Sequence, residues 1–159
     1  MRGVVQQASR RRGARGALAG LVAILGLGCA SGGTGSAEAV ALYGEESPEA
    51  VVETFLNAAK RDDYRTMVRL FGTTSGPAER RLGRTDVEQR MFVLAAFLEH
   101  QSFSVRRSGL TEGPGRLRLL ADMVGTRNGN ASVPIVVAEY RGRWFVEQVV
   151  TDPLTGTTR

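Results

Sequence analysis

Cys29 is the most reactive side chain in this sequence, and its position decides how it is interpreted. It is the only cysteine in 159 residues, and it stands where an apolar run gives way to a stretch rich in Gly, Ser and Ala. A thiolate is a strong nucleophile, whereas a buried thiol behaves as a small apolar group, so Cys29 could be a reactive site or a core residue. With one cysteine, the chain has no framework of internal disulfides.

Asp122 and His100 are the candidates for acid–base chemistry, which needs a carboxylate or an imidazole within reach of the transferred proton. Asp122 lies in a predicted strand among apolar neighbours, and burial there would raise the pKa of its carboxyl group. Strand alternation puts it on the face opposite Leu119 and Ala121, which favours a solvent-facing aspartate or one paired with an arginine across the sheet. His100, the only histidine, follows a predicted helix, and this position favours a capping or solvated role.

The sequence offers few other kinds of site. His, Cys, Asp and Glu do not cluster at metal-ligand spacing, and there is no phosphate-binding loop or dinucleotide fingerprint, so we expect neither a metal nor a cofactor. Arg80, Arg81 and Arg84 form a basic cluster in a predicted loop, with Arg90 in the helix that follows. These arginines could bind an anion, but a solvated loop is the simpler interpretation.

Charge is distributed unevenly along the chain. Five of the 21 Lys and Arg residues precede Cys29 and all 16 Asp and Glu residues follow it, so 16 basic residues face 16 acidic ones from Cys29 onward. The high isoelectric point therefore belongs to the N-terminal segment. Because nucleic-acid binding needs a basic surface, we expect no nucleic-acid partner.

Residues 1–28 have the organisation of an export signal. Residues 1–16 are polar and basic, and residues 17–28 are apolar and uncharged. A helix over that apolar run would span about 18 Å, short of the roughly 30 Å of a bilayer core, so we predict a signal peptide and not a membrane-spanning helix. Small residues follow the arginine run, and this favours the general secretory route over the twin-arginine route.

The stretch Leu25-Gly26-Leu27-Gly28-Cys29 resembles the processing box of bacterial lipoprotein precursors, although Gly26 stands where leucine is usual. The resemblance implies that the Cys29 thiol receives a diacylglyceryl group. It also implies that cleavage before Cys29 frees an amino group, which can take a further acyl chain such as palmitate. The lipid bilayer would then be the partner of the acylated chain. Two chains matter because one gives only marginal membrane binding. Ala30, which is not an aspartate, implies the outer membrane facing the periplasm if the cell is didermal. The alternative is the spare cysteine of an ordinary signal peptide.

Residues 29–46 are rich in Gly, Ser, Ala and Glu, and we predict a flexible tether there, with a short helix over residues 37–43 as the alternative. A folded domain is expected over residues 47–152 and a C-terminal tail over residues 153–159. Within the domain, Ser47 is predicted to cap a first helix that begins at Pro48, and a second short helix follows over residues 64–71.

Residues 72–83 contain Gly, Pro, Ser and Thr and are predicted to form a loop. The run Thr85-Asp86-Val87-Glu88 matches a capping box, so a third helix is expected from about Asp86 to Glu99. Its apolar arc is wide, and we therefore expect it to be largely buried.

After His100 the apolar period changes from 3.6 to 2, which predicts four strands joined by short turns in an antiparallel meander. Pro134 lacks a backbone N–H and suggests an edge position or a bulge in the third strand. Helices followed by such a sheet indicate an α+β fold in which the helices cover one sheet face.

Residues 47–59, SPEAVVETFLNAA, lead into Asp62-Asp63-Tyr64, and the last strand carries Gly142-Arg143-Trp144-Phe145-Val146. Over residues 47–150 this pattern resembles the nuclear-transport-factor-2-like superfamily, and within it the small bacterial lipoprotein domains. The resemblance implies N-terminal helices packed on a curved four-stranded antiparallel sheet that forms a cone with a pocket. A strand that some members place between their helices is absent here or hidden within residues 72–83.

Two classes of function follow from these expectations. The first is a non-catalytic envelope lipoprotein, anchored at Cys29, whose domain binds a small apolar ligand or an envelope protein. The second is an enzyme like the ketosteroid isomerases and polyketide cyclases of the superfamily, with Asp122 or His100 as the acid or base in the cone. We expect the first.

Overall fold

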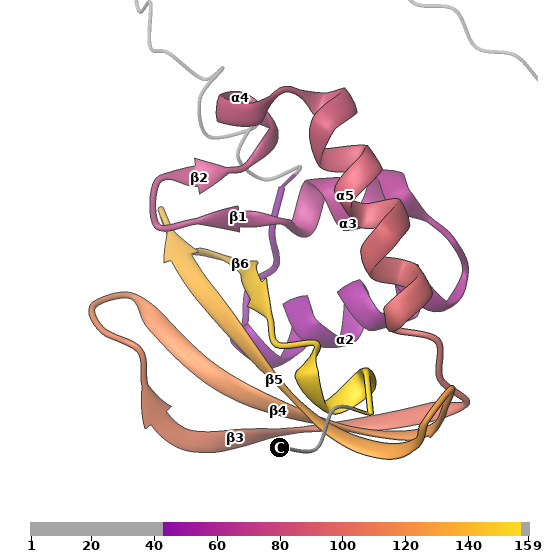
Figure 1. Cartoon of the computed structure of the whole chain (residues 1–159). Coiled ribbons are helices and arrows are strands. Elements are labelled where there is room, and N and C mark those ends of the chain that lie inside the picture. The colour runs from indigo at the N-terminus through magenta and orange to yellow at the C-terminus, as the bar shows by residue number, and fades with distance from the viewer. Residues whose placement is uncertain (1–42, 157–159) are drawn as a thin grey trace, which may run out of the picture. The chain divides into compact units, whose positions relative to one another are not determined.

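The computed structural model describes residues 43–156, in which helices precede a four-stranded antiparallel sheet (Figure 1). The predicted signal peptide over residues 1–28 lies outside the described residues, as do Cys29 and the rest of the predicted tether up to residue 42. The elements, in chain order, are α2 (Pro48–Lys60), α3 (Tyr64–Leu70), β1 (Gly72–Thr73), β2 (Gly76–Pro77), α4 (Glu79–Leu82), α5 (Arg84–Phe97), β3 (Ser102–Thr111), β4 (Arg116–Thr126), β5 (Gly129–Tyr140), β6 (Arg143–Val149) and the 3-10 helix η1 (Asp152–Leu154).

The first two predicted helices are confirmed. Ser47 caps α2 by accepting a hydrogen bond from the Ala50 N–H at 3.1 Å, and Pro48 takes the first helical position, where its missing N–H costs nothing. Asp63 caps α3 in the same way, by accepting from the Thr66 N–H at 3.1 Å.

The segment between the second and third helices is more ordered than expected. Residues 72–83 were predicted to be a loop, but they contain the β1–β2 hairpin and the short helix α4. The predicted capping box is also wrong, because Thr85 lies inside α5. Gly83 occupies the N-cap position with φ +85°, a backbone conformation that favours glycine, and no side chain caps this end.

The sheet has the strand order β3-β4-β5-β6, as the meander predicts. Pro134 is not on an edge, because β5 lies between β4 and β6. The register shift in the β5–β6 pairing falls between Val136 and Val137, two residues beyond it. The Val150 N–H donates to the Pro134 carbonyl at 2.9 Å, just past the end of β6 at Val149. In an antiparallel pair, the N–H and the C=O of one residue point toward the same neighbouring strand. The N–H that Pro134 lacks would therefore point toward the segment just past the end of β6.

One hydrophobic core cluster joins the helices to the sheet. Strand alternation is confirmed in β4, where Leu119, Ala121 and Met123 are buried and Asp122 is on the other face. The helices contribute mainly the fully buried side chains of α2 together with parts of α3 and α5. The largest buried side chains of the domain include Phe55, Leu56, Met67, Met91, Leu98, Leu119, Met123, Ile135 and Phe145.

The packed region extends beyond both expected domain boundaries. Glu45 and Trp144 exchange two backbone hydrogen bonds of 2.9 and 2.7 Å, and the Gly44 N–H donates to the Arg69 carbonyl. The tether predicted to reach residue 46 therefore includes residues that pair with β6. At the other end, Leu154 is only 5% exposed and belongs to the core, so the predicted tail from residue 153 begins inside the packed region.

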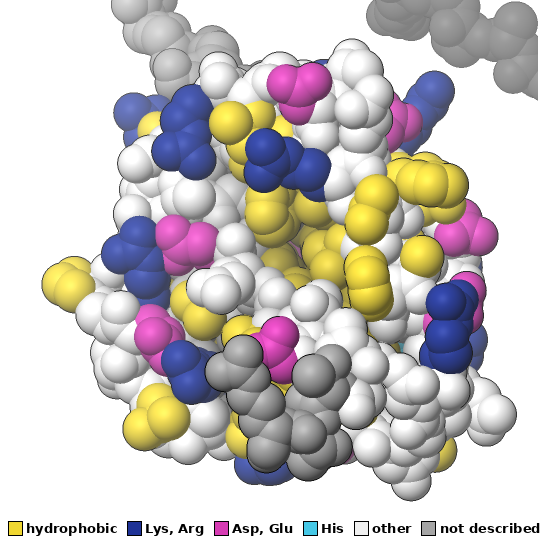
Figure 2. All heavy atoms as spheres, in the orientation of Figure 1, with side chains coloured by type: hydrophobic (Ala, Val, Ile, Leu, Met, Phe, Trp, Pro, Cys, Tyr) yellow, Lys and Arg dark blue, Asp and Glu magenta, His cyan; other side chains and the backbone are white. Residues whose placement is uncertain are grey.

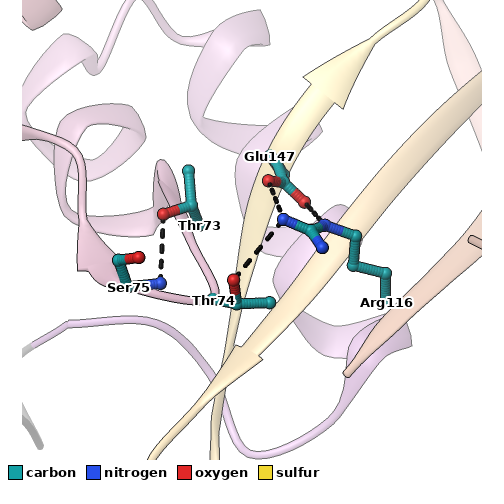
Figure 3. Close-up of polar contacts among 5 residues, drawn as sticks. All are labelled: Thr73, Thr74, Ser75, Arg116 and Glu147. Carbon is teal, nitrogen blue, oxygen red and sulfur yellow. Dashed lines mark hydrogen bonds and ion pairs between the residues drawn. The ribbon is translucent and has the colours of Figure 1, made fainter. Parts of the chain in front are cut away.

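A partly buried ion pair holds the β1–β2 turn against the sheet (Figure 3). Arg116 of β4 donates to both carboxylate oxygens of Glu147 in β6, at 2.6 and 3.0 Å, and to the Thr74 hydroxyl at 3.4 Å. The two charged residues lie on strands separated by β5, and the hydrogen bond that Arg116 donates to Glu147 raises the pKa of Arg116. This contact therefore links three segments that are distant in the sequence.

Candidate functional site

Helix α5 presents apolar side chains on more than one side. Val87, Met91, Ala95 and Leu98, at helical spacing, are buried against the core. Other apolar residues of the same helix remain open to solvent: Phe92 is 61% exposed, Val93 55% and Phe97 44%. The expectation that this helix is largely buried is therefore wrong, because three of its large apolar side chains are 44% exposed or more.

A groove of about 520 Å³ runs beside α5, and we call it the α5 groove. Seven residues line it, all from α5 except the one that follows β6: Asp86, Gln89, Arg90, Val93, Leu94, Phe97 and Thr151. Figure 2 shows hydrophobic side chains gathered in a hollow of this face, with a basic side chain at its border. A volume of this size lies in the range of small-molecule sites.

The α5 groove is polar at one end and apolar at the other. Asp86 and Arg90 are one helical turn apart, and neither forms a hydrogen bond or an ion pair through its side chain within the described part of the chain. Val93, Leu94 and Phe97 follow toward the C-terminal end of the helix. The arrangement suits a ligand that is mainly apolar and carries a polar group at one end.

Asp122 lies outside this groove, on the exposed face of the sheet. Its carboxylate forms an ion pair with Arg106 at 2.7 Å and accepts a hydrogen bond from the Ser132 hydroxyl at 2.6 Å. These two contacts, that of Arg106 first, lower the pKa of Asp122. The predicted pairing with an arginine across the sheet is confirmed, and the carboxyl group lacks the raised pKa that a buried general base would need.

His100 is only 8% exposed, so the expectation of a solvated imidazole is wrong. Its Nδ1 donates to the carbonyl of Leu98, which ends α5, at 2.6 Å, and its ring packs edge-on against Phe103 at 5.2 Å. Its Nε2 is buried without a hydrogen-bond partner among the described residues. The imidazole therefore fixes the end of α5, as a helix-terminal role predicts.

His100 also lines a second hollow of about 380 Å³ between α2, α3 and α5. Apart from His100 Nε2, the polar groups there have partners: for example, the Tyr64 hydroxyl donates to Asp62 at 3.0 Å, and the Lys60 ammonium donates to the Gln101 carbonyl at 2.5 Å. Phe92 closes this side of the helix by packing edge-on against Tyr64 at 5.6 Å. Neither His100 nor Asp122 lines the α5 groove.

The arginines predicted to form a basic cluster before the third helix lie at different sites in the structure. Arg90 lines the α5 groove, whereas Arg84 lines a third hollow on the side of α3, and the Arg80 guanidinium lies 6.0 Å from the centre of the Tyr43 ring. Arg65 and Arg69 of α3 join Arg84 there, and sequence reasoning missed both. Their position four residues apart on one short helix was the available signal, because such residues share a helix face.

Within residues 43–156, no helix combines the length and the hydrophobicity needed to cross a membrane. No family model matches this chain, and neither a curated protein nor a solved structure matches it. The case for function therefore depends on the sequence and on the geometry given above.

Proposed function

We propose that this chain is an exported lipoprotein, anchored to the cell envelope through acylated Cys29, whose domain binds an apolar ligand in the α5 groove. The observation that carries the binding role is the solvent exposure of Val93 and Phe97 along one groove. A concave site lined by apolar side chains, with a few polar groups at its border, is the usual form of a small-molecule site.

A binding role is favoured over a catalytic one by where the acid–base candidates lie. Asp122 is paired with Arg106 on the exposed sheet face, and His100 is buried at the end of α5, so neither borders the groove. A ligand in the α5 groove would meet apolar side chains over most of its length.

The anchoring role is proposed from the sequence. The apolar run that ends at Gly28-Cys29 is too short to span a bilayer as a helix, and a thioether at Cys29 would supply the membrane affinity instead. An outer-membrane position facing the periplasm is proposed from Ala30, for a didermal cell.

For the fold, we propose a nuclear-transport-factor-2-like domain whose sheet curves into a cone. Register shifts in each of the three strand pairs support curvature, because a bulge bends a strand and increases its twist. The β1–β2 hairpin between the helices is a candidate for the strand that some members of the superfamily carry there.

Metabolic labelling tests the anchor. The full chain, expressed in a bacterial host that processes lipoproteins, should incorporate labelled palmitate, and C29S should incorporate none. A matched variant, S31A, changes the adjoining segment without removing the thiol and should be labelled as the wild type is. Label retained in C29S, or no label in the wild type, would contradict the anchor.

Extraction and mass spectrometry test the ligand. The 33–159 segment, expressed without the apolar leader, should carry an apolar molecule through purification under native conditions, and V93S/F97S should not. Recovery of the same molecule from both proteins would contradict binding in the α5 groove.

A further inference from the structure

Three arginines from two helices converge on one hollow. Arg65 and Arg69 come from α3 and Arg84 is the first residue of α5, and all three line a hollow of about 350 Å³ that we call the arginine hollow. Their guanidinium groups are exposed, and like charges so arranged repel one another unless an anion lies between them.

These three arginines differ from most others in the domain. Within residues 43–156, none of them forms an ion pair, whereas six arginines elsewhere do: Arg106, Arg107, Arg116, Arg118, Arg127 and Arg143. Arg69 donates only to the Thr66 hydroxyl, at 3.1 Å. Arg61, Arg80, Arg81, Arg90 and Arg141 also form no ion pair among the described residues, but Arg65, Arg69 and Arg84 are the unpaired arginines that line one hollow together.

Two carboxylates border the arginine hollow, and both are already engaged. Glu79 accepts a hydrogen bond from the Tyr43 hydroxyl, and this hydrogen bond is the main cause of the raised pKa of Tyr43. Asp63 accepts the Thr66 N–H as the cap of α3. These carboxylates offset part of the positive charge, but neither pairs with a guanidinium group of the hollow among the described contacts.

Helix α5 adds a second source of positive potential. It is 14 residues long, and no side chain caps its N-terminus. The free N–H groups of such an end carry about half a positive charge and favour anions nearby, although Asp86 in the first turn of α5 offsets part of this charge. Arg84 stands at this end of the helix and lines the hollow at the same time.

We propose that the arginine hollow binds a phosphate-bearing anion through Arg65, Arg69 and Arg84. Guanidinium groups match phosphate because their parallel N–H donors reach two oxygens at once. The anion could be a phospholipid headgroup or a free phosphate compound, which share this chemistry.

The lipid source rests on the proposed anchor at Cys29. Tyr43, the first described residue, lines the hollow, and 13 residues separate it from Cys29. The composition of these 13 residues predicts a flexible tether, and a flexible chain of that length has an end-to-end distance of roughly 20 Å. An acylated Cys29 would therefore hold the arginine hollow close to the headgroups of its own membrane.

Phosphate titration tests the site itself. The full chain in a nonionic, phosphate-free detergent is titrated with inorganic phosphate by calorimetry. R65Q/R84Q should weaken binding at least tenfold. R127Q/R141Q, which removes the same charge at exposed positions away from the hollow, should change it less than twofold. Equal losses in both variants, or no binding by the wild type, would overturn the proposal.

Two further variants keep the result interpretable. R65K/R84K retains the charge and should bind phosphate more tightly than R65Q/R84Q, which separates loss of the site from loss of the fold. C29S should bind phosphate as the wild type does, so failure of the anchor and failure of the hollow are distinguishable.

Doped micelles separate the two sources of phosphate. Short-chain phosphatidylglycerol should compete with inorganic phosphate if the site takes a lipid headgroup, while phosphatidylcholine, with no net charge, should compete far less. Phosphate binding that phosphatidylglycerol does not reduce would support a free phosphate compound and overturn the headgroup source. Competition by phosphatidylglycerol that is equal in R65Q/R84Q would overturn the hollow as the headgroup site.

Discussion

Replacing Val93 and Phe97 together with serine should weaken apolar ligand binding ten- to a hundredfold without unfolding the domain. A phenylalanine side chain offers roughly 200 Å², and Phe97 is 44% exposed, so a ligand can cover about 90 Å² of it, worth about 2 kcal/mol. Val93, at 55% exposure, adds about 1 kcal/mol. Full coverage of both side chains therefore corresponds to roughly a hundredfold in affinity, and half coverage to roughly tenfold.

Titration of the 33–159 segment with a neutral fluorescent probe, N-phenyl-1-naphthylamine, measures this effect. The matched control is L110S, because Leu110 is 57% exposed but does not line the groove. Both variants should remain folded at the assay temperature, with the melting temperature of V93S/F97S lowered because more than half of the Phe97 side chain is covered in the folded chain. Wild-type affinity in V93S/F97S, or an equal loss in L110S, would refute the assignment of the α5 groove.

Three further predictions concern the fold. M91A should cost about 2–5 kcal/mol of unfolding free energy because Met91 is only 1% exposed. F92A should cost less, about 1–2 kcal/mol, because Phe92 is 61% exposed and loses mainly its edge-on contact with Tyr64. A larger loss in F92A than in M91A, measured by urea denaturation, would mean that α5 is turned differently. S47A should cost about 1 kcal/mol of unfolding free energy because it removes the side chain that caps α2. T85A should cost much less, because Thr85 caps no helix. A lower melting temperature for T85A than for S47A would support the capping box that the sequence predicts. The pKa of Asp122 is lowered in the folded state, so its contribution to stability is present above about pH 4 and is lost as the pH falls below it. D122N should therefore make the unfolding free energy fall less steeply with decreasing pH in the acidic range. A slope unchanged from the wild type would contradict the ion pair.

Local signals in the sequence were sufficient for the first helices and for the sheet. The Ser47-Pro48 start of α2 depends on neighbouring residues alone, and so does the alternation that buries Leu119, Ala121 and Met123. The pairing of Asp122 with an arginine followed from the same alternation, because a charged residue on the outer face of a strand has cross-strand neighbours within reach.

Features set by long-range contacts could not be read in this way. The apolar residues of α5 spread around the helix, and a sequence does not say which side of a helix will lack a partner. The helix was therefore expected to be largely buried, whereas Val93 and Phe97 are exposed. The bond between Arg116 and Glu147 crosses β5, and the Glu45–Trp144 pairing joins residues 99 positions apart. Such contacts depend on the topology of the whole domain.

Photolabelling tests the central claim, that an apolar ligand binds in the α5 groove, most directly. The 33–159 segment is irradiated with a diazirine-bearing alkyl probe, and the labelled peptides are mapped by mass spectrometry. We predict that the label falls mainly within α5, between Asp86 and Phe97, with a smaller share at Thr151. Label spread equally over Leu110 and Val124, which are comparably exposed but outside the groove, would contradict the claim.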